Sequence, residues 1–239
     1  MGGSVPQARR RRPAGLRRVN LSALHRRLLA DVLSIGSPYP LVITGGYAVQ
    51  AHGLVNRLSQ DLDVATENPA PMADIAQTLQ RGLDQRGWDV TVISVDPLSA
   101  RLMAADRATG EECEVDVLKE NLWSEPYETE YGPVLALEDV IGTKVRALAD
   151  RGAVRDLIDV HAAAEHRTHA DLERLGDRHG RDEFRLHDLR ERLGGADWYD
   201  DEEFAAYGLA EAEIADLRAW AQAWADDLDR RLEDADYDG

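Results

Sequence analysis

Two adjacent glycines between an apolar run and a helical pattern constrain the fold of this chain more than any other feature. Residues 41–44 read Leu-Val-Ile-Thr, which predicts a short buried strand that ends at Gly45 and Gly46. From residue 48 to 54 the apolar positions follow helical spacing. A glycine turn lets the backbone approach a ligand closely, and the N-terminus of the next helix offers free N–H groups to an anion. The pattern predicts a turn that holds phosphate.

A second short strand follows, and it carries Asp61 and Asp63. Side chains alternate between the faces of a strand, so both carboxylates should point to the same side. Carboxylates that close repel each other unless a cation lies between them. Oxygen ligands of this kind favour Mg²⁺, which also bridges nucleotide phosphates. Together with the glycine turn, this strand predicts a site for a metal ion and a nucleoside triphosphate.

A third acidic position lies in the predicted strand 112–118. Val115 and Val117 should face one side and Glu114 and Asp116 the other, beside the first two aspartates if the strands are neighbours. There Asp116 would complete the metal shell and help to deprotonate an attacking hydroxyl. Glu114 could substitute for it. The alternative is an ordinary amphipathic strand with one wet face.

The second half of the chain begins with a predicted helix that has a lysine inside its apolar stripe. Lys144 lies seven residues after Leu137, on the same face. A lysine there keeps its stem in the core and carries its charge to an edge, where it can bind phosphate or simply reach solvent.

Gly152 ends this helix and a new one begins at once. Arg155 and Asp159 lie one turn apart, so we expect them to pair, and Asp156 shares a face with Asp159. On the residues alone, this segment can be a structural cluster of ion pairs that fastens the two halves together.

The Gly-Gly turn, a helix and the run Arg57-x-Ser59-x-Asp61-x-Asp63 resemble nucleotidyltransferases of the polymerase-β type, most closely the AbiEii/AbiGii toxin branch with its MenT-like members. That family has a third carboxylate on a later strand, then a lysine and an Arg-Asp-x-x-Asp motif in a helical part, and this chain has them in order. The likeness covers residues 41–159. It implies the nucleotidyltransferase fold of the α/β (α+β) class, a small mixed sheet flanked by helices, with a helical C-terminal part.

The resemblance also implies roles for individual residues. Catalysis and metal binding fall to Asp61, Asp63 and Asp116, and the Arg-Asp-x-x-Asp segment closes the nucleotide pocket from the helical side. Nucleotide binding is expected at Gly45, Gly46, Arg57, Ser59, Lys144, Arg155 and Asp156. Two Mg²⁺ ions are the implied cofactors and a nucleoside triphosphate is the substrate. Gly46 stands where many members have a phosphate-binding serine, which leaves the triphosphate one side-chain donor short.

Charge and composition divide the chain into four parts. Residues 1–18 contain arginines and no acid, which predicts a disordered basic tail. We expect a nucleotidyltransferase core at 19–136 and a helical part at 137–195 that completes the nucleotide site. Residues 196–239 hold 15 acidic and 3 basic residues, −12 of the net charge of −17, and should form an acidic linker and an amphipathic helix at 210–232 that docks on the body.

Smaller elements can be assigned from periodicity. Helices are expected at 21–33 and 72–87, strands at 88–95, 98–106 and 134–136, and polar helices at 171–178 and 183–193.

Composition excludes several classes of protein. No apolar run reaches the roughly 18 residues of a membrane span, and no apolar signal core occurs at the N-terminus, so we expect no membrane association and a cytoplasmic location. The single cysteine, Cys113, excludes an internal disulfide and a multi-cysteine zinc site, and should be a small buried apolar residue.

Three functions fit these features. The resemblance implies a toxin that transfers a nucleotide to an RNA hydroxyl, such as a tRNA 3′ end, and that has a cognate antitoxin protein. A nucleotidyltransferase that modifies an aminoglycoside or lincosamide antibiotic is the first alternative, because a cationic drug needs an acidic pocket. A non-catalytic nucleotide-binding module is the second.

Overall fold

The computed structural model describes residues 17, 19–57, 59–165, 167–180 and 183–237. Within them, seven strands form one mixed sheet in the order β3-β4-β5-β2-β1-β7-β6. The strands are β1 (Val42–Ile43), β2 (Leu62–Thr66), β3 (Trp88–Asp96), β4 (Ser99–Asp106), β5 (Glu112–Lys119), β6 (Tyr127–Thr129) and β7 (Gly132–Val134). The predicted class, a small mixed sheet with a helical C-terminal part, is confirmed.

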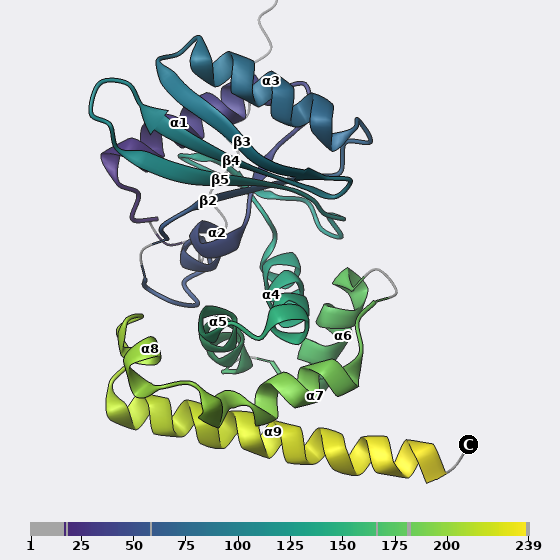
Figure 1. The fold of residues 1–239 in the computed structure, drawn as a ribbon. Helices are drawn as coiled ribbons and strands as arrows, with labels where there is room; N and C mark the ends of the chain where they lie inside the picture. Colours follow the sequence, from purple (N-terminus) through teal and green to yellow (C-terminus); the bar gives the residue numbers. More distant parts are fainter. Residues whose placement is uncertain (1–16, 18, 58, 166, 181–182, 238–239) are drawn as a thin grey trace, which may run out of the picture.

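Helices cover both faces of the sheet and form a layer below it (Figure 1). Helices α1 (Ala23–Ile35) and α3 (Met72–Asp84) lie on one face, and α2 (Gly45–Ala51) lies on the other, toward the helical half. The helical half contains α4 (Leu137–Arg151), α5 (Val154–Ala164), α6 (His169–His179), α7 (Leu186–Gly194), the 3-10 helix η1 (Ala196–Trp198), α8 (Asp201–Ala205) and α9 (Glu211–Tyr237).

The central strands follow the alternation expected of a sheet with one polar face. On β2 the side chains of Leu62 and Val64 are buried, and on the parallel neighbour β5 those of Val115 and Val117 are buried. Because side chains alternate, the residues between them point to the opposite face, toward the helical half. This alternation is what places acidic side chains of two different strands in one site.

Two clusters of buried apolar side chains meet within α4. The cluster around the sheet includes Val140, and the cluster of the helical half begins at Ile141. Helix α4 therefore joins the two halves by contributing side chains to both cores. It ends at Gly152, which adopts a left-handed conformation with φ 65°, and α5 starts directly after it. The division of the chain at residues 136 and 195 stays a prediction.

Several elements differ from the sequence-based expectations. The structure adds β6, which is too short to give a periodic signal, and α8, which lies in the stretch predicted as linker. The strand expected at 134–136 is β7, which ends at Val134, although the Leu135 N–H still donates to the carbonyl of Ile43 at 3.0 Å. Strand β2 begins at Leu62, so Asp61 lies in the loop directly before the strand and not within it.

The other expectations have separate outcomes. The predicted basic tail lies outside the described residues except for Arg17, whose N–H donates to the Ala51 carbonyl at 2.8 Å. Cys113 is buried at 2% exposure, which confirms its prediction. In the part of the chain that the structure describes, no helix has both the length and the apolar character needed to cross a bilayer.

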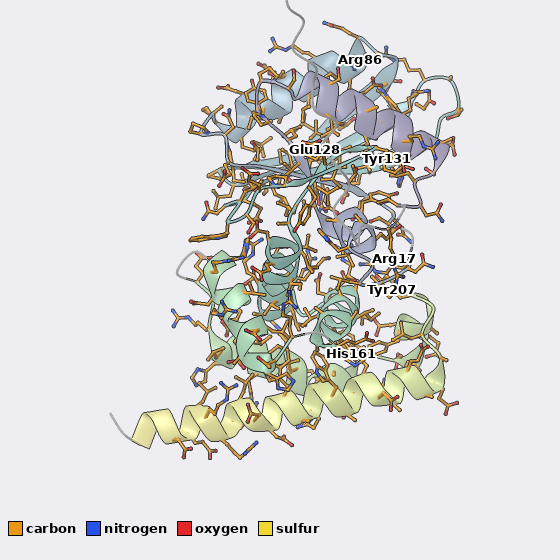
Figure 2. All side chains as sticks on the ribbon, turned by 180° about the vertical axis from the view of Figure 1, so that it is seen from behind. Arg17, Arg86, Glu128, Tyr131, His161 and Tyr207 are labelled. Carbon is orange, nitrogen blue, oxygen red and sulfur yellow. The ribbon has the colours of Figure 1, made fainter. Side chains whose placement is uncertain are left out.

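Helix α9 packs along the helical half as the amphipathic pattern predicts (Figure 1). Its seam is fully covered and consists of Ile214, Leu217, Ala221, Trp224 and Leu228. The Trp224 indole N–H donates to Glu173 Oε1 at 2.9 Å, and the ring stacks on His169 with 4.6 Å between centroids. A second contact joins His161, which faces α9 (Figure 2), to Trp220 at 4.8 Å.

We predict that Trp224→Ala lowers the free energy of unfolding by about 3–5 kcal/mol, because it leaves a cavity under α9 and removes the indole hydrogen bond to Glu173. Urea titration followed by circular dichroism would measure the change. Trp198→Ala is the matched control, since that ring is 81% exposed, and it should change stability by less than about 0.5 kcal/mol. Equal effects of the two variants would contradict the docking of α9.

Candidate active site

A cavity of about 420 Å³ lies between the polar face of the sheet and helices α4 and α5. Ten residues were predicted to form a site, and all but one of them line this cavity. They are Gly45, Gly46, Arg57, Ser59, Asp61, Asp63, Asp116, Lys144 and Arg155. The exception is Asp156, whose carboxylate is fully covered behind the wall. Residues that lie more than 100 positions apart in the chain thus meet in one cavity.

Strand register places the two strand-borne aspartates side by side. Asp63 on β2 is the direct partner of Asp116 on the parallel strand β5. On the other side of β2, the Asp63 carbonyl accepts a hydrogen bond at 3.0 Å from the N–H of Thr44, the residue before the glycine turn. The turn, Asp63 and Asp116 therefore form a row across neighbouring strands. The sequence predicted this row only on the condition that the strands were neighbours.

Both glycines of the turn are required by close contacts. Gly45 has φ +58°, and a Cβ added to it would lie 1.9 Å from Asp63 Oδ2. A Cβ on Gly46 would lie 2.4 Å from Ser59 Oγ. The Ser59 hydroxyl donates to Asp61 Oδ1 at 3.0 Å. The space next to Gly46, where many relatives were expected to place a serine side chain, is thus occupied by a hydroxyl from position 59.

The aspartates carry negative charge that the protein compensates only in part. Burial and the nearby carboxylates of Asp61 and Asp116 together raise the pKa of Asp63 to about 6, against the opposing effect of Lys144 and Arg155. Asp61 accepts a weak contact from Arg155 Nη1 at 3.4 Å. A carboxyl group with such a pKa binds a proton more readily than usual, and a bound cation would favour its ionised form.

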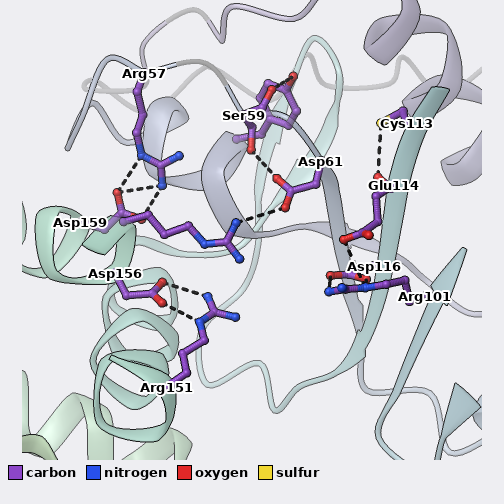
Figure 3. A network of polar contacts seen from close by, with 12 residues as sticks. Arg57, Ser59, Asp61, Arg101, Cys113, Glu114, Asp116, Arg151, Asp156 and Asp159 are labelled. Atoms are coloured by element: carbon purple, nitrogen blue, oxygen red, sulfur yellow. Dashed lines mark hydrogen bonds and ion pairs between the residues drawn. The ribbon is translucent and has the colours of Figure 1, made fainter. Parts of the chain in front are cut away.

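Asp116 is held by an arginine that the sequence analysis missed (Figure 3). Arg101 on β4 donates to Asp116 Oδ1 at 2.8 Å and to Asp116 Oδ2 at 2.7 Å, and its Nε lies 3.2 Å from Glu114 Oε1. These carboxylates raise the pKa of Arg101 above its ordinary value, the hydrogen bond to Asp116 first among the causes. Asp116 lines the cavity and Glu114 does not, so the structure favours Asp116 over the alternative acid.

The three aspartates have the type of ligand atom that a metal ion needs, but their side chains are not arranged around one point. Asp61, Asp63 and Asp116 offer the carboxylate oxygens that Mg²⁺ prefers. Among the described residues, however, no three acidic, histidine or cysteine side chains converge on one point. The guanidinium groups of Arg101 and Arg155 take up part of the charge that a cation would neutralise. The two predicted Mg²⁺ ions stay a prediction.

Lys144 reaches the cavity from a buried ion-pair network. Its Nζ lies 2.8 Å from Asp159 Oδ2 and 3.3 Å from Asp156 Oδ1, and its side chain is 10% exposed. Burial would lower the pKa of Lys144, but Asp159 and Asp156 outweigh it and raise the pKa above the ordinary value. Arg151 completes the network through hydrogen bonds of 2.7 and 3.1 Å to Asp156. Asp156 therefore acts by holding Lys144 and Arg151.

Asp159 fastens the two halves together, although not through the predicted partner. The expected pair of Arg155 and Asp159 is wrong, because Arg155 turns into the cavity toward Asp61. Arg57, from the segment before β2, binds Asp159 instead, with Nη2 at 2.9 Å from Oδ2. The Arg57 guanidinium also lies 5.4 Å from the ring of Tyr207, which sits where the helical half approaches α2 (Figure 2). Arg57 is thus held on two sides by the helical half.

The cavity also contains arginines that sequence reasoning missed, namely Arg101, Arg146 and Arg151. Arg101 could have been noticed, because it is a charged residue on a strand whose alternate residues Ala100, Leu102 and Ala104 are apolar. Its place opposite Asp116 depends on strand pairing, which one sequence does not show.

A sequence profile of the family described as "Nucleotidyl transferase AbiEii toxin, Type IV TA system" matches residues 27–235. The chain belongs to this AbiEii toxin family. It is therefore a nucleotidyltransferase with a nucleoside triphosphate as substrate. A comparison with curated proteins gives no match.

Solved structures agree with the AbiEii fold. JHP933 from Helicobacter pylori is similar with 21% identity and a TM-score of 0.53, over 91% of this chain and 99% of that one. MenT4, a nucleotidyltransferase toxin from Mycobacterium tuberculosis, is similar with 19% identity and a TM-score of 0.56, over 87% of this chain and 85% of that one. These likenesses extend through both the sheet and the helical half.

We predict a pH-dependent gain in stability for Asp63→Asn in the metal-free protein. The pKa of Asp63 is about 6 in the folded protein and 3.8 ordinarily. The wild type therefore loses stability as the pH rises from 3.8 to about 6, where the unfolded chain has released this proton and the folded protein still holds it. The variant should exceed the wild type by up to about 3 kcal/mol at pH 8, and by much less at pH 4. Urea titration in the presence of a chelator would measure this.

Asp89→Asn is the matched control for this experiment, because its carboxylate is 70% exposed on the outer strand β3. It removes the same charge and should change stability by less than about 0.5 kcal/mol at both pH values. A gain for Asp63→Asn that is the same at pH 4 and pH 8 would contradict the assigned environment of Asp63.

Proposed function

We propose that this protein transfers a nucleoside monophosphate from a nucleoside triphosphate to the 3′ hydroxyl of an RNA, most simply a tRNA, and that it acts in this way as the toxin of a toxin–antitoxin pair. The family supplies the reaction type, and the cavity supplies the argument for the acceptor. The observation that carries the proposal is the charge of the cavity wall, which differs from that of the whole chain.

The chain has a formal net charge of −17, yet the cavity wall is slightly cationic. Its cations are Arg57, Arg101, Lys144, Arg146, Arg151 and Arg155, and its acids are Asp61, Asp63, Asp116, Glu120 and Asp150. A wall with six cationic and five acidic side chains suits a triphosphate and an anionic acceptor. These cations favour an anionic acceptor over the cationic drug of the antibiotic-modifying alternative.

The nucleotide would lie along the glycine turn. Backbone N–H groups at Gly45 and Gly46, the start of α2 and the Ser59 hydroxyl would bind the terminal phosphates. Lys144 and Arg155 approach the same space from the helical half and would offset the phosphate charge. Asp61, Asp63 and Asp116 would hold Mg²⁺, which would supply charge stabilisation for the transferred phosphoryl group.

The reaction would be an in-line displacement at the α-phosphorus. The acceptor oxygen forms a bond to that phosphorus, and the bond between the α-phosphorus and the bridging oxygen breaks, so that its electron pair leaves with pyrophosphate. Asp116 takes the proton of the acceptor hydroxyl. Each of its oxygens accepts one hydrogen bond from Arg101 and keeps a further lone pair that can take this proton.

The toxin role and its setting follow from the family. A nucleotidyltransferase that blocks tRNA would arrest growth, and a cognate antitoxin protein would relieve the arrest. Nucleoside triphosphates and tRNA are both present in the cytoplasm, which is the proposed location. The second alternative, a non-catalytic nucleotide-binding module, would require that Asp61→Ala and Asp116→Ala leave every phenotype intact.

We predict that the purified protein, incubated with Mg²⁺, total RNA and each α-labelled nucleoside triphosphate in turn, places label on a tRNA-sized band. Asp63→Ala should reduce this labelling at least about 100-fold, because it removes a carboxylate from the reacting centre. Asp89→Ala is the control and should label like the wild type.

Two outcomes would contradict the proposal. Label that appears only on an aminoglycoside or lincosamide would favour the antibiotic-modifying alternative. Full labelling of RNA by the Asp63→Ala variant would show that the aspartate row is not the reacting centre.

A further inference from the structure

We propose that Ile93, Ser94 and Arg101, at the β3–β4 end of the cavity, form an acceptor subsite that binds the 3′-terminal nucleotides of a single-stranded polynucleotide. This inference rests on the proposed function and extends it from the reacting centre to the acceptor. Arg101 would bind a phosphate of the incoming strand, and Ile93 would pack against a base or ribose.

The first argument is the order of residues across the sheet. Ser94 on β3 pairs with Arg101 on β4, Arg101 pairs with Asp116 on β5, and Asp116 pairs with Asp63 on β2. The glycine turn lies beyond β2, at the opposite end of this row. A triphosphate on the turn places its reacting phosphorus near the aspartates, so the acceptor must approach from the end that carries Arg101 and Ser94.

The second argument is a bulge in the outer strand. The pairing of β3 with β4 shifts between Val92 and Ser94, which leaves Ile93 without a partner in the register. As a result both Ile93 and Ser94 face the cavity, although they are consecutive residues. Bulges of this kind commonly redirect a side chain next to an active site. Here the bulge turns Ser94 to the cavity face beside Ile93, whose side chain is 55% exposed.

The third argument concerns which nitrogens of the Arg101 guanidinium are already hydrogen-bonded. Its side chain is 44% exposed, and it is bound through Nε and Nη2 to carboxylates of β5. Within the described residues, its Nη1 has no hydrogen-bond partner. A planar guanidinium suits a phosphate with two oxygens presented together. A phosphate can therefore bind at Nη1 while Nε and Nη2 stay on Asp116.

The fourth argument is the room at this end of the cavity. Ser94 and Asp63 are separated by three inter-strand spacings, roughly 14 Å, so the site extends well beyond the reacting atoms. β3 is the outermost strand of the sheet. Ile93, an exposed apolar side chain that lines the same cavity as Arg101, matches with it the alternation of base and phosphate along a polynucleotide.

The test is binding of a 5′-labelled 12-nucleotide single-stranded RNA, measured by fluorescence anisotropy in Mg²⁺ without nucleoside triphosphate. Arg101→Gln should weaken binding about tenfold and reduce the slope of log affinity against log salt by about 1. Ile93→Ser should weaken binding about threefold to tenfold with no change in that slope. The affinity of the Ile93→Ser variant for a non-hydrolysable nucleoside triphosphate should stay within about threefold of the wild type.

Two matched variants serve as controls. Arg107→Gln removes the same charge at the far end of the β3–β4 hairpin, where Arg107 binds Asp89 at 2.7 Å. Val95→Ser truncates an exposed residue of β3 that does not line the cavity. Both should bind RNA like the wild type.

The outcomes separate this inference from the proposed function. The subsite would be overturned, even if nucleotidyl transfer occurs, by an RNA affinity that is unchanged in Arg101→Gln and Ile93→Ser. An RNA affinity that falls equally in the two control variants would overturn it as well. Loss of nucleotide binding in parallel with RNA binding in the Ile93→Ser variant would place this end of the cavity on the triphosphate side and also overturn it. RNA binding that depends on both residues, without any transfer to RNA, would support the subsite and contradict the proposed function.

Discussion

Three carboxylates in one partly buried cavity must be neutralised, and much of this structure serves that need. Asp63 and Asp116 are paired on neighbouring strands, and Asp61 lies directly before the strand that carries Asp63. Their mutual repulsion and burial raise the pKa of Asp63 to about 6. Cations from both halves of the protein offset this negative charge, so the site is complete only when the helical half covers the sheet.

The same cations give the helical half its position. Lys144 lies between the acids of the cavity and a second pair of buried acids, Asp156 and Asp159. Asp159 also binds Arg57 from the sheet side, and this contact crosses between the halves. A buried charge is tolerated only when it is paired, so these ion pairs hold the helical half in one position against the sheet. The residues proposed to bind substrate therefore also attach the helical half to the sheet.

Local patterns predicted the parts of the site that lie within one strand or turn. Gly45, Gly46, Asp61 and Asp63 fall in one continuous stretch, and alternation along a strand was enough to orient Asp116. The same reasoning failed for Arg155, because helix spacing offered Asp159 as a partner while the fold supplied Asp61. The partner that Asp159 does have, Arg57, is 102 residues away in the chain. Pairings between distant segments, including Arg101 with Asp116, depend on strand order and remained invisible in the sequence.

The measurement that tests the account most directly is calorimetric binding of a non-hydrolysable nucleoside triphosphate with Mg²⁺ to the wild type and to Gly45→Ala. A Cβ at this position would displace Asp63, and its left-handed φ is strained for alanine, so binding should fall at least about 30-fold. Gly110→Ala is the matched control, because Gly110 has φ +75° in the β4–β5 turn and nothing within 4 Å of an added Cβ. Wild-type affinity in a folded Gly45→Ala variant would contradict a nucleotide site built on the glycine turn and Asp63.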